Sequence, residues 1–141
     1  MELGRKLKVY YFTAVFSVMF SLLGFSYNAW RLEATEDNSN IRMAAFSVLN
    51  TLSELEQLVY AAHYDHDEVE GNPRKGWIKV GLISDLSSLI GPKVGEKAES
   101  LRLSWGENWE LLGQENDSSD QIVAEIDEVR LQIKMVIKDL N

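Results

Sequence analysis

The longest uncharged stretch of the sequence runs from Val9 to Trp30 and constrains the fold more than any other feature. The hydrocarbon core of a bilayer, roughly 30 Å thick, is crossed by about 20 helical residues. Arg5, Lys6 and Lys8 precede the stretch. Arg31 follows it directly, and then come the acidic residues Glu33, Glu36 and Asp37. We therefore predict that residues 9–30 form a single transmembrane helix.

The charges on either side of this helix predict its orientation. Basic flanks stay on the cytoplasmic side of a membrane. Residues 1–8 are therefore expected in the cytoplasm, with residues 31–141 as a periplasmic or extracellular domain of an inner (plasma) membrane protein. A cleaved signal peptide is the alternative, because Gly24 would suit position −3 for cleavage after Ser26. Apolar regions of signal peptides span only about 7–15 residues, so a retained anchor is favoured.

Small residues recur within the span at steps of three, four and three, at Ala14, Ser17, Ser21 and Gly24. This spacing places them on one helix face, where small side chains let transmembrane helices approach closely. Chance is the alternative, because such residues are common in any span. As a packing face, these residues indicate a membrane-embedded partner, which could be a second copy of the chain.

The charge and cysteine content of the remainder exclude several classes of function. From Arg31 onward the chain has 11 basic and 21 acidic residues, and it has no cysteine anywhere. Nucleic acids require a basic surface, so they are excluded as partners. Disulfides, thiolate metal sites and cysteine nucleophiles are excluded as well. Protein partners, small ligands and cations remain.

Two heptad patterns predict long helices at the two ends of this domain. The first pattern consists of Ile41, Ala45, Val48, Leu52, Leu55, Val59 and Ala62. The second consists of Ile122, Ile126, Val129, Ile133, Val136 and Leu140. Each seam serves either a core or an interaction surface, within one chain or between chains. Ser118 and Gln121 fit a capping box at the start of the second helix.

Two weaker helices are expected between these seams. Asn72 and Pro73 suit the start of a helix over residues 73–90, which Gly91 and Pro92 would end, and another is expected over residues 93–112. Glycines weaken both helices, unless they allow close packing against a bulky side chain such as Trp105. We therefore predict an all-α fold with one N-terminal transmembrane helix and an antiparallel four-helix-type bundle.

The polar stretch Glu33–Asn40 joins the anchor to the first helix of the bundle. Its Asp, Asn and Ser residues favour caps and turns. Either a hinge or one continuous helix is compatible with this composition. We expect a continuous helix with fraying or a kink near Asn38, because the span and the seam share a heptad phase.

His63 and His66 would lie one turn apart if the first helix continued, and either Asp67 or Glu70 could add a carboxylate. Two imidazoles and a carboxylate are suitable ligands for zinc or nickel. The alternative is an exposed helix end, where histidines lie near the negative pole of the helix dipole. The tryptophans Trp77, Trp105 and Trp109 suit either an aromatic ligand pocket or, at helical spacing, the core.

No catalytic constellation or cofactor motif stands out, so we predict a non-enzymatic protein without a cofactor. Its bundle is expected to be an interaction or structural subunit of a cell-envelope complex, with membrane or periplasmic proteins as partners. The layout resembles the front half of bacterial chemoreceptors, which implies a sensory or ligand-binding bundle as the first alternative. Because no cytoplasmic domain follows Leu140, such a sensor would signal through a partner. A metal-binding bundle that uses His63 and His66 is the second alternative.

Overall fold

The computed structural model describes residues 1–140, and all the regular structure in this range is helical. The elements in chain order are α1 (Glu2–His63), α2 (Pro73–Ile90), α3 (Pro92–Asn108), the short 3₁₀ helix η1 (Trp109–Leu111) and α4 (Asn116–Asp139). The prediction of an all-α fold is therefore confirmed for the described residues. The chain divides into two compact units, Met1–Ser39 and the residues from Asn40 onward.

The first unit is the N-terminal part of α1, which is long and apolar enough to cross a membrane. Every residue from Met1 to Glu33 is exposed, so no packing within the chain accounts for the apolar side chains there. Phe12, Phe16 and Phe20 form a ladder with ring centroids 6.4 and 6.1 Å apart. The Ser21 hydroxyl donates a hydrogen bond to the Ser17 carbonyl at 2.8 Å, so this hydroxyl is paired within the helix.

The polar stretch Glu33–Asn40 is helical throughout and belongs to α1. Thr35 directs its hydroxyl back along the helix and donates to the Arg31 carbonyl at 2.8 Å. The Thr35 side chain thus makes its hydrogen bond within the helix. Such side chains can also bond to the backbone in a cap or turn, and that would end the helix. The boundary between the two compact units follows Ser39.

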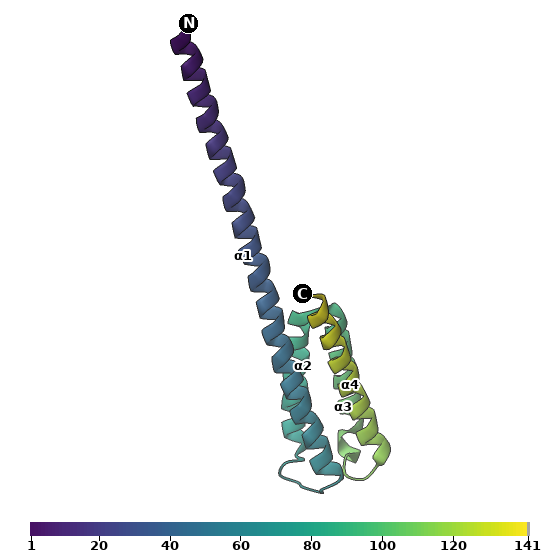
Figure 1. Cartoon of the computed structure of the whole chain (residues 1–141). Coiled ribbons are helices and arrows are strands. Elements are labelled where there is room, and N and C mark those ends of the chain that lie inside the picture. The colour runs from purple at the N-terminus through teal and green to yellow at the C-terminus, as the bar shows by residue number, and fades with distance from the viewer. Residues whose placement is uncertain (141) are drawn as a thin grey trace. The chain divides into compact units, whose positions relative to one another are not determined.

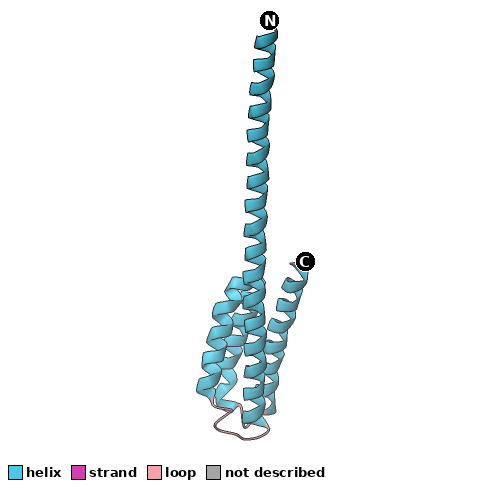
Figure 2. Ribbon diagram, turned by 60° about the vertical axis from the view of Figure 1, so that its left-hand side comes forward, coloured by secondary structure: helices cyan, strands magenta, loops and turns pink. Residues whose placement is uncertain are grey.

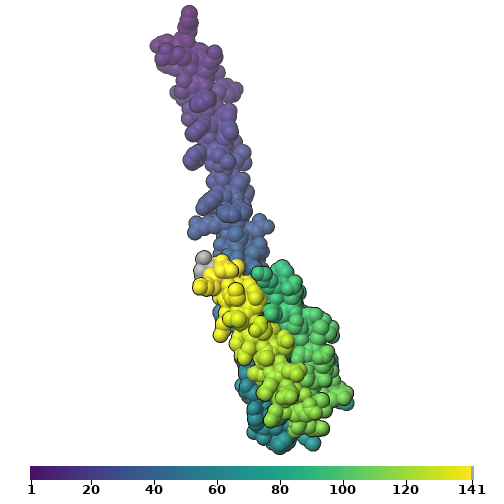
Figure 3. All heavy atoms as spheres, turned by 90° about the vertical axis from the view of Figure 1, so that its right-hand side faces the viewer, coloured from purple at the N-terminus to yellow at the C-terminus, as the bar shows by residue number. Residues whose placement is uncertain are grey.

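The second unit holds one hydrophobic core to which α1, α2, α3 and α4 all contribute. Figures 1 and 2 show the ribbons of these helices. Atoms of α3 and α4 lie side by side in the space-filling view (Figure 3). The two heptad seams supply much of the core: Ala45, Val48, Leu52, Leu55, Val59, Ile122, Ile126, Val129 and Ile133 are fully buried. Ile41, Ala62 and Val136 pack against its edge.

The ends of α2 follow from local chemistry. The Asn72 side chain accepts a hydrogen bond from the Arg74 amide at 2.9 Å, and Pro73 occupies the first helical position. Gly91 then separates α2 from α3, which begins at Pro92. The prediction of a helix over residues 73–90 is confirmed.

The start of α4 differs from the expectation. The helix begins at Asn116, so Ser118 lies inside the first turn and is buried instead of capping it. Gln121 accepts a hydrogen bond at its Oε1 from Nδ2 of Asn108 on α3, at 3.2 Å. The predicted capping box is therefore wrong, because packing between helices engages Gln121 and buries Ser118.

Gly76 of α2 lies against the Trp105 side chain of α3. A methyl group at this position would overlap the six-membered ring of Trp105, which is fully buried. The expectation that a glycine permits close packing against Trp105 is confirmed at this position. At Gly81 an added methyl group would meet nothing within 4 Å.

Candidate functional site

The second unit carries a hollow of about 440 Å³ at the end where α1 stops, called here the end hollow. Its walls include Ala62, His66, Asp67, Glu68, Trp109 and Glu110. Three segments that are distant in sequence meet there: the last turn of α1, the loop of residues 64–72, and the region of η1.

Glycine permits this close meeting of segments. A side chain at Gly71 would collide with the backbone of Ala62 and with the carbonyl oxygen of Asp67. Gly71 is itself buried, and its amide donates a hydrogen bond to that same Asp67 carbonyl at 2.8 Å. The loop is thereby held against the last turn of α1.

The three residues predicted to bind a metal have different environments. His63 is the last residue of α1, and its ring lies edge-on to Tyr64 with centroids 4.6 Å apart. The Nδ1 atom of His63 is buried and has no hydrogen-bond partner among the described residues. His66 lines the end hollow and adopts a positive φ of 50°, in the left-handed region.

Asp67 makes hydrogen bonds within the loop of residues 64–72. Its Oδ1 accepts hydrogen bonds from the amides of Val69 at 2.9 Å and Glu70 at 3.1 Å. These backbone hydrogen bonds lower the pKa of the Asp67 carboxyl below its usual value. No group of three or more His, Cys, Asp or Glu residues in residues 1–140 is arranged to hold a metal ion, and the metal site stays a prediction.

A second hollow of about 570 Å³ lies between the last turns of α1 and the start of α2. Two of its four acidic residues pair with lysines. Lys75 pairs with Glu70 at 3.3 Å, and Lys79 of α2 pairs with Glu54 of α1. The hydrogen bond and the charge of Lys79 lower the pKa of Glu54 below its usual value.

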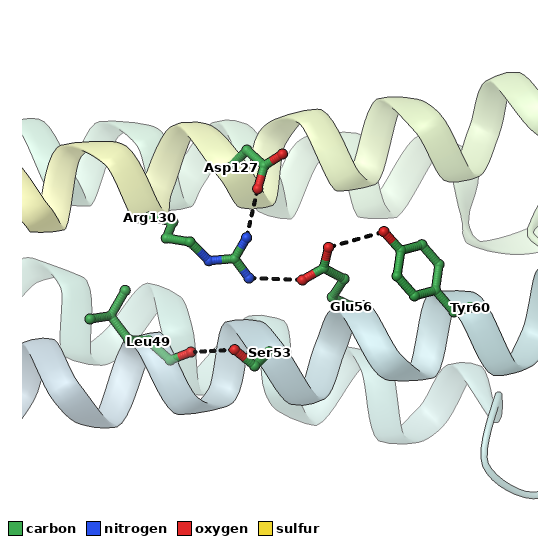
Figure 4. A network of polar contacts seen from close by, with 6 residues as sticks. All are labelled: Leu49, Ser53, Glu56, Tyr60, Asp127 and Arg130. Carbon is green, nitrogen blue, oxygen red and sulfur yellow. Dashed lines mark hydrogen bonds and ion pairs between the residues drawn. The ribbon is translucent and has the colours of Figure 1, made fainter.

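A polar network joins α1 to α4 (Figure 4). Arg130 of α4 donates to Glu56 of α1 at 2.8 Å and to Asp127 at 2.6 Å. Glu56 also accepts a hydrogen bond from the Tyr60 hydroxyl at 3.0 Å. Partial burial and this contact with Glu56 raise the pKa of Tyr60.

The three tryptophans of this unit have unequal roles. Trp105 is fully buried in the core, and Trp77 lies edge-on to it at 6.5 Å while remaining 40% exposed. Trp109 is half-buried and contributes to the wall of the end hollow. Glu110, which shares that hollow with Glu68, was not singled out from the sequence, because only the fold brings it to the loop.

The small residues predicted as a packing face all lie on the exposed surface of the first unit: Ala14, Ser17, Ser21 and Gly24. A methyl group added at Gly24 would meet nothing within 4 Å. The face is therefore free of packing within the described part of the chain.

The outer face of α2 carries three exposed apolar side chains at helical spacing. Ile78 is 73% exposed, Leu82 43% and Leu89 66%. Their spacing of four and seven residues aligns them along one side of the helix.

Comparison with protein-family models, with curated proteins and with solved structures finds no match for this chain.

Proposed function

We propose that this chain is a non-enzymatic, single-pass membrane protein whose extracytoplasmic part is an antiparallel four-helix bundle that docks on other envelope proteins. The observation that carries the proposal is the uncharged stretch from Val9 to Trp30, which is helical and exposed along its entire length. Lipid is the environment in which so much exposed apolar surface is stable.

The flanking charges support an inner-membrane protein with its N-terminal side in the cytoplasm. Arg5, Lys6 and Lys8 precede the span, and acidic residues follow it. Tyr10 and Tyr11 near one end, and Tyr27 and Trp30 near the other, suit the two membrane interfaces.

The outer face of α2 supports a docking role for the bundle. The apolar heptad residues of α1 and α4 pack in the core or against its edge, so they are not available to a partner. Ile78, Leu82 and Leu89 remain exposed on α2, and aligned apolar side chains on a folded surface are typical of protein contacts. The acidic surface favours protein partners over nucleic acids.

Extraction of the full-length protein in mild detergent, followed by co-purification, tests the docking role. We expect a stoichiometric companion protein whose recovery falls when Ile78 and Leu89 are both replaced by Glu. Leu103→Glu on α3, where the leucine is 55% exposed, is the matched control and should leave recovery unchanged. Recovery of the chain alone, without a companion, would argue strongly against the proposal.

The orientation is tested separately, because the chain contains no cysteine of its own. A single cysteine replacing the exposed Ser100 should react with a membrane-impermeant maleimide added outside spheroplasts. A cysteine replacing Gly4 should react only after the membrane is permeabilised. The opposite pattern would reverse the proposed orientation.

A further inference from the structure

The two hollows near the last turn of α1 differ in how their negative charge is compensated. In the hollow between α1 and α2, Lys75 and Lys79 pair with Glu70 and Glu54. The end hollow is lined by Asp67, Glu68 and Glu110, and no lysine or arginine lies among its lining residues. Of these three, Asp67 also lines the other hollow, where the charge of Lys75 acts on it, so the contrast rests on Glu68 and Glu110. Among residues 1–140, Glu68 and Glu110 make no side-chain hydrogen bond or ion pair, so their charge is uncompensated.

The helix ends around the end hollow add to this negative potential. α1 ends at His63, so its negative pole lies beside Ala62 in the wall. The positive pole of α2 also reaches the hollow, but the Asn72 side chain accepts the Arg74 amide and Pro73 has no N–H to offer. The amides that would attract an anion there are therefore partly occupied or missing.

The same hollow has an apolar side. Trp109 and Leu112 contribute to its walls, and the face of an indole ring attracts cations that carry apolar groups. A volume of about 440 Å³ is large for a bare metal ion and falls within the range of small-molecule sites.

We propose that the end hollow is a binding site for a small organic cation of the alkylammonium class. The carboxylates of Glu68 and Glu110 compensate its charge, and Trp109 and Leu112 contact its methyl or methylene groups. This site is independent of the docking role proposed above, since it lies on the loops at one end of the unit and uses none of the exposed residues of α2.

Choline and its uncharged isostere 3,3-dimethylbutan-1-ol are the probes that test this site. Isothermal titration calorimetry on the full-length protein, in a detergent with an uncharged headgroup, compares their binding at low salt. We expect choline to bind saturably and the isostere at least about tenfold more weakly, because the two share their shape and differ in charge. Equal binding of the two, or no saturable binding of choline, overturns the proposal.

Variants then locate the site. Glu68→Gln combined with Glu110→Gln should weaken choline binding about threefold or more, as partly exposed charge pairs do. Glu96→Gln, which removes an exposed charge on α3, is the matched control and should have no effect. An equal loss in the control would show that choline responds only to the overall charge, and would refute a site here.

Two substitutions of Trp109 distinguish the contribution of its aromatic ring to binding from the contribution of its apolar bulk. Trp109→Leu should weaken choline binding about two- to fivefold, the contribution of a cation–π contact at an exposed site. Trp109→Phe should retain part of the affinity. Thermal unfolding followed by circular dichroism verifies that the variants are folded. Unchanged choline affinity in a folded Trp109→Leu variant would show that Trp109 takes no part in binding. It would thereby refute the proposed class of ligand.

Discussion

At the scale of single residues, Gly76 shows how the core depends on the absence of a side chain. Trp105 occupies the space that a methyl group at this position would need. Alanine is the better helix former by up to about 1 kcal/mol, so propensity and packing act in opposite directions here. Packing should decide the outcome, since both the ring and the helix backbone are held within a core.

We therefore expect Gly76→Ala to lower the free energy of unfolding by about 1–3 kcal/mol, the range for overpacked cores. Gly81→Ala, in the same helix with open space around it, should raise the free energy of unfolding by about 0.5–1 kcal/mol. Chemical unfolding of the full chain in detergent, followed by tryptophan fluorescence, measures both. Stabilisation by both substitutions would contradict the observed packing of Trp105.

At the scale of helical elements, α1 and α4 are joined by apolar seams and by the polar network at their edge. Glu56 is the centre of that network, since it accepts hydrogen bonds from Tyr60 and from Arg130. Its negative charge favours the protonated phenol, and partial burial of the phenol does so as well. The pKa of Tyr60 is therefore raised above the usual value of a tyrosine.

A raised pKa in the folded state links stability to alkaline pH. The contribution of the Tyr60 phenol is present in full below the pKa of an unfolded tyrosine. It is lost as the pH rises through the raised pKa of the folded protein. Wild-type protein should thus lose stability in this range, and Tyr60→Phe should lose less, as measured by urea unfolding at a series of pH values. Tyr64→Phe is the control, because Tyr64 is 66% exposed and has no carboxylate partner among the described hydrogen bonds. An equal effect of the control would assign the loss to other groups.

The elements also show how far the sequence could predict the fold. The bounds of α2 were predicted, because Asn72, Pro73 and Gly91 specify them through local backbone chemistry. The start of α4 was not, because the burial of Ser118 and the hydrogen bond to Gln121 depend on a neighbouring helix. Heptad spacing identified the core residues of α1 and α4, but it could not say that both seams would be buried within one chain.

The candidate site was less predictable for the same reason. His66 and Asp67 were singled out by residue type, and the structure places both in the wall of the end hollow. Trp109 and Glu110 enter that wall from a different part of the chain, and no sequence pattern couples them to the loop of residues 64–72. A pairing of this kind arises from tertiary packing and has no local signal.

At the scale of the whole molecule, the proposed membrane span has a surface suited to more than attaching the second unit. The span presents an aromatic ladder and, on another side of the helix, the small residues Ala14, Ser17, Ser21 and Gly24. The Ser21 hydroxyl already donates a hydrogen bond to the Ser17 carbonyl, so close approach of a partner helix would leave no hydroxyl donor of Ser21 unpaired. Close approach between helices is what stabilises their association in lipid.

Enlarging this face should therefore weaken the complex while leaving the protein in the membrane. We expect Ser17→Leu combined with Gly24→Leu to reduce recovery of the companion protein, since a loss of about 1.4 kcal/mol of helix packing means tenfold weaker association. Val15→Leu combined with Leu22→Phe enlarges exposed side chains elsewhere on the span and should have little effect. Quantitative co-purification from detergent extracts measures both, and alkaline extraction of membranes verifies that each variant is still inserted. If both pairs reduce recovery equally, the span contributes only its apolar length. If neither does, the partner binds the extracytoplasmic bundle alone.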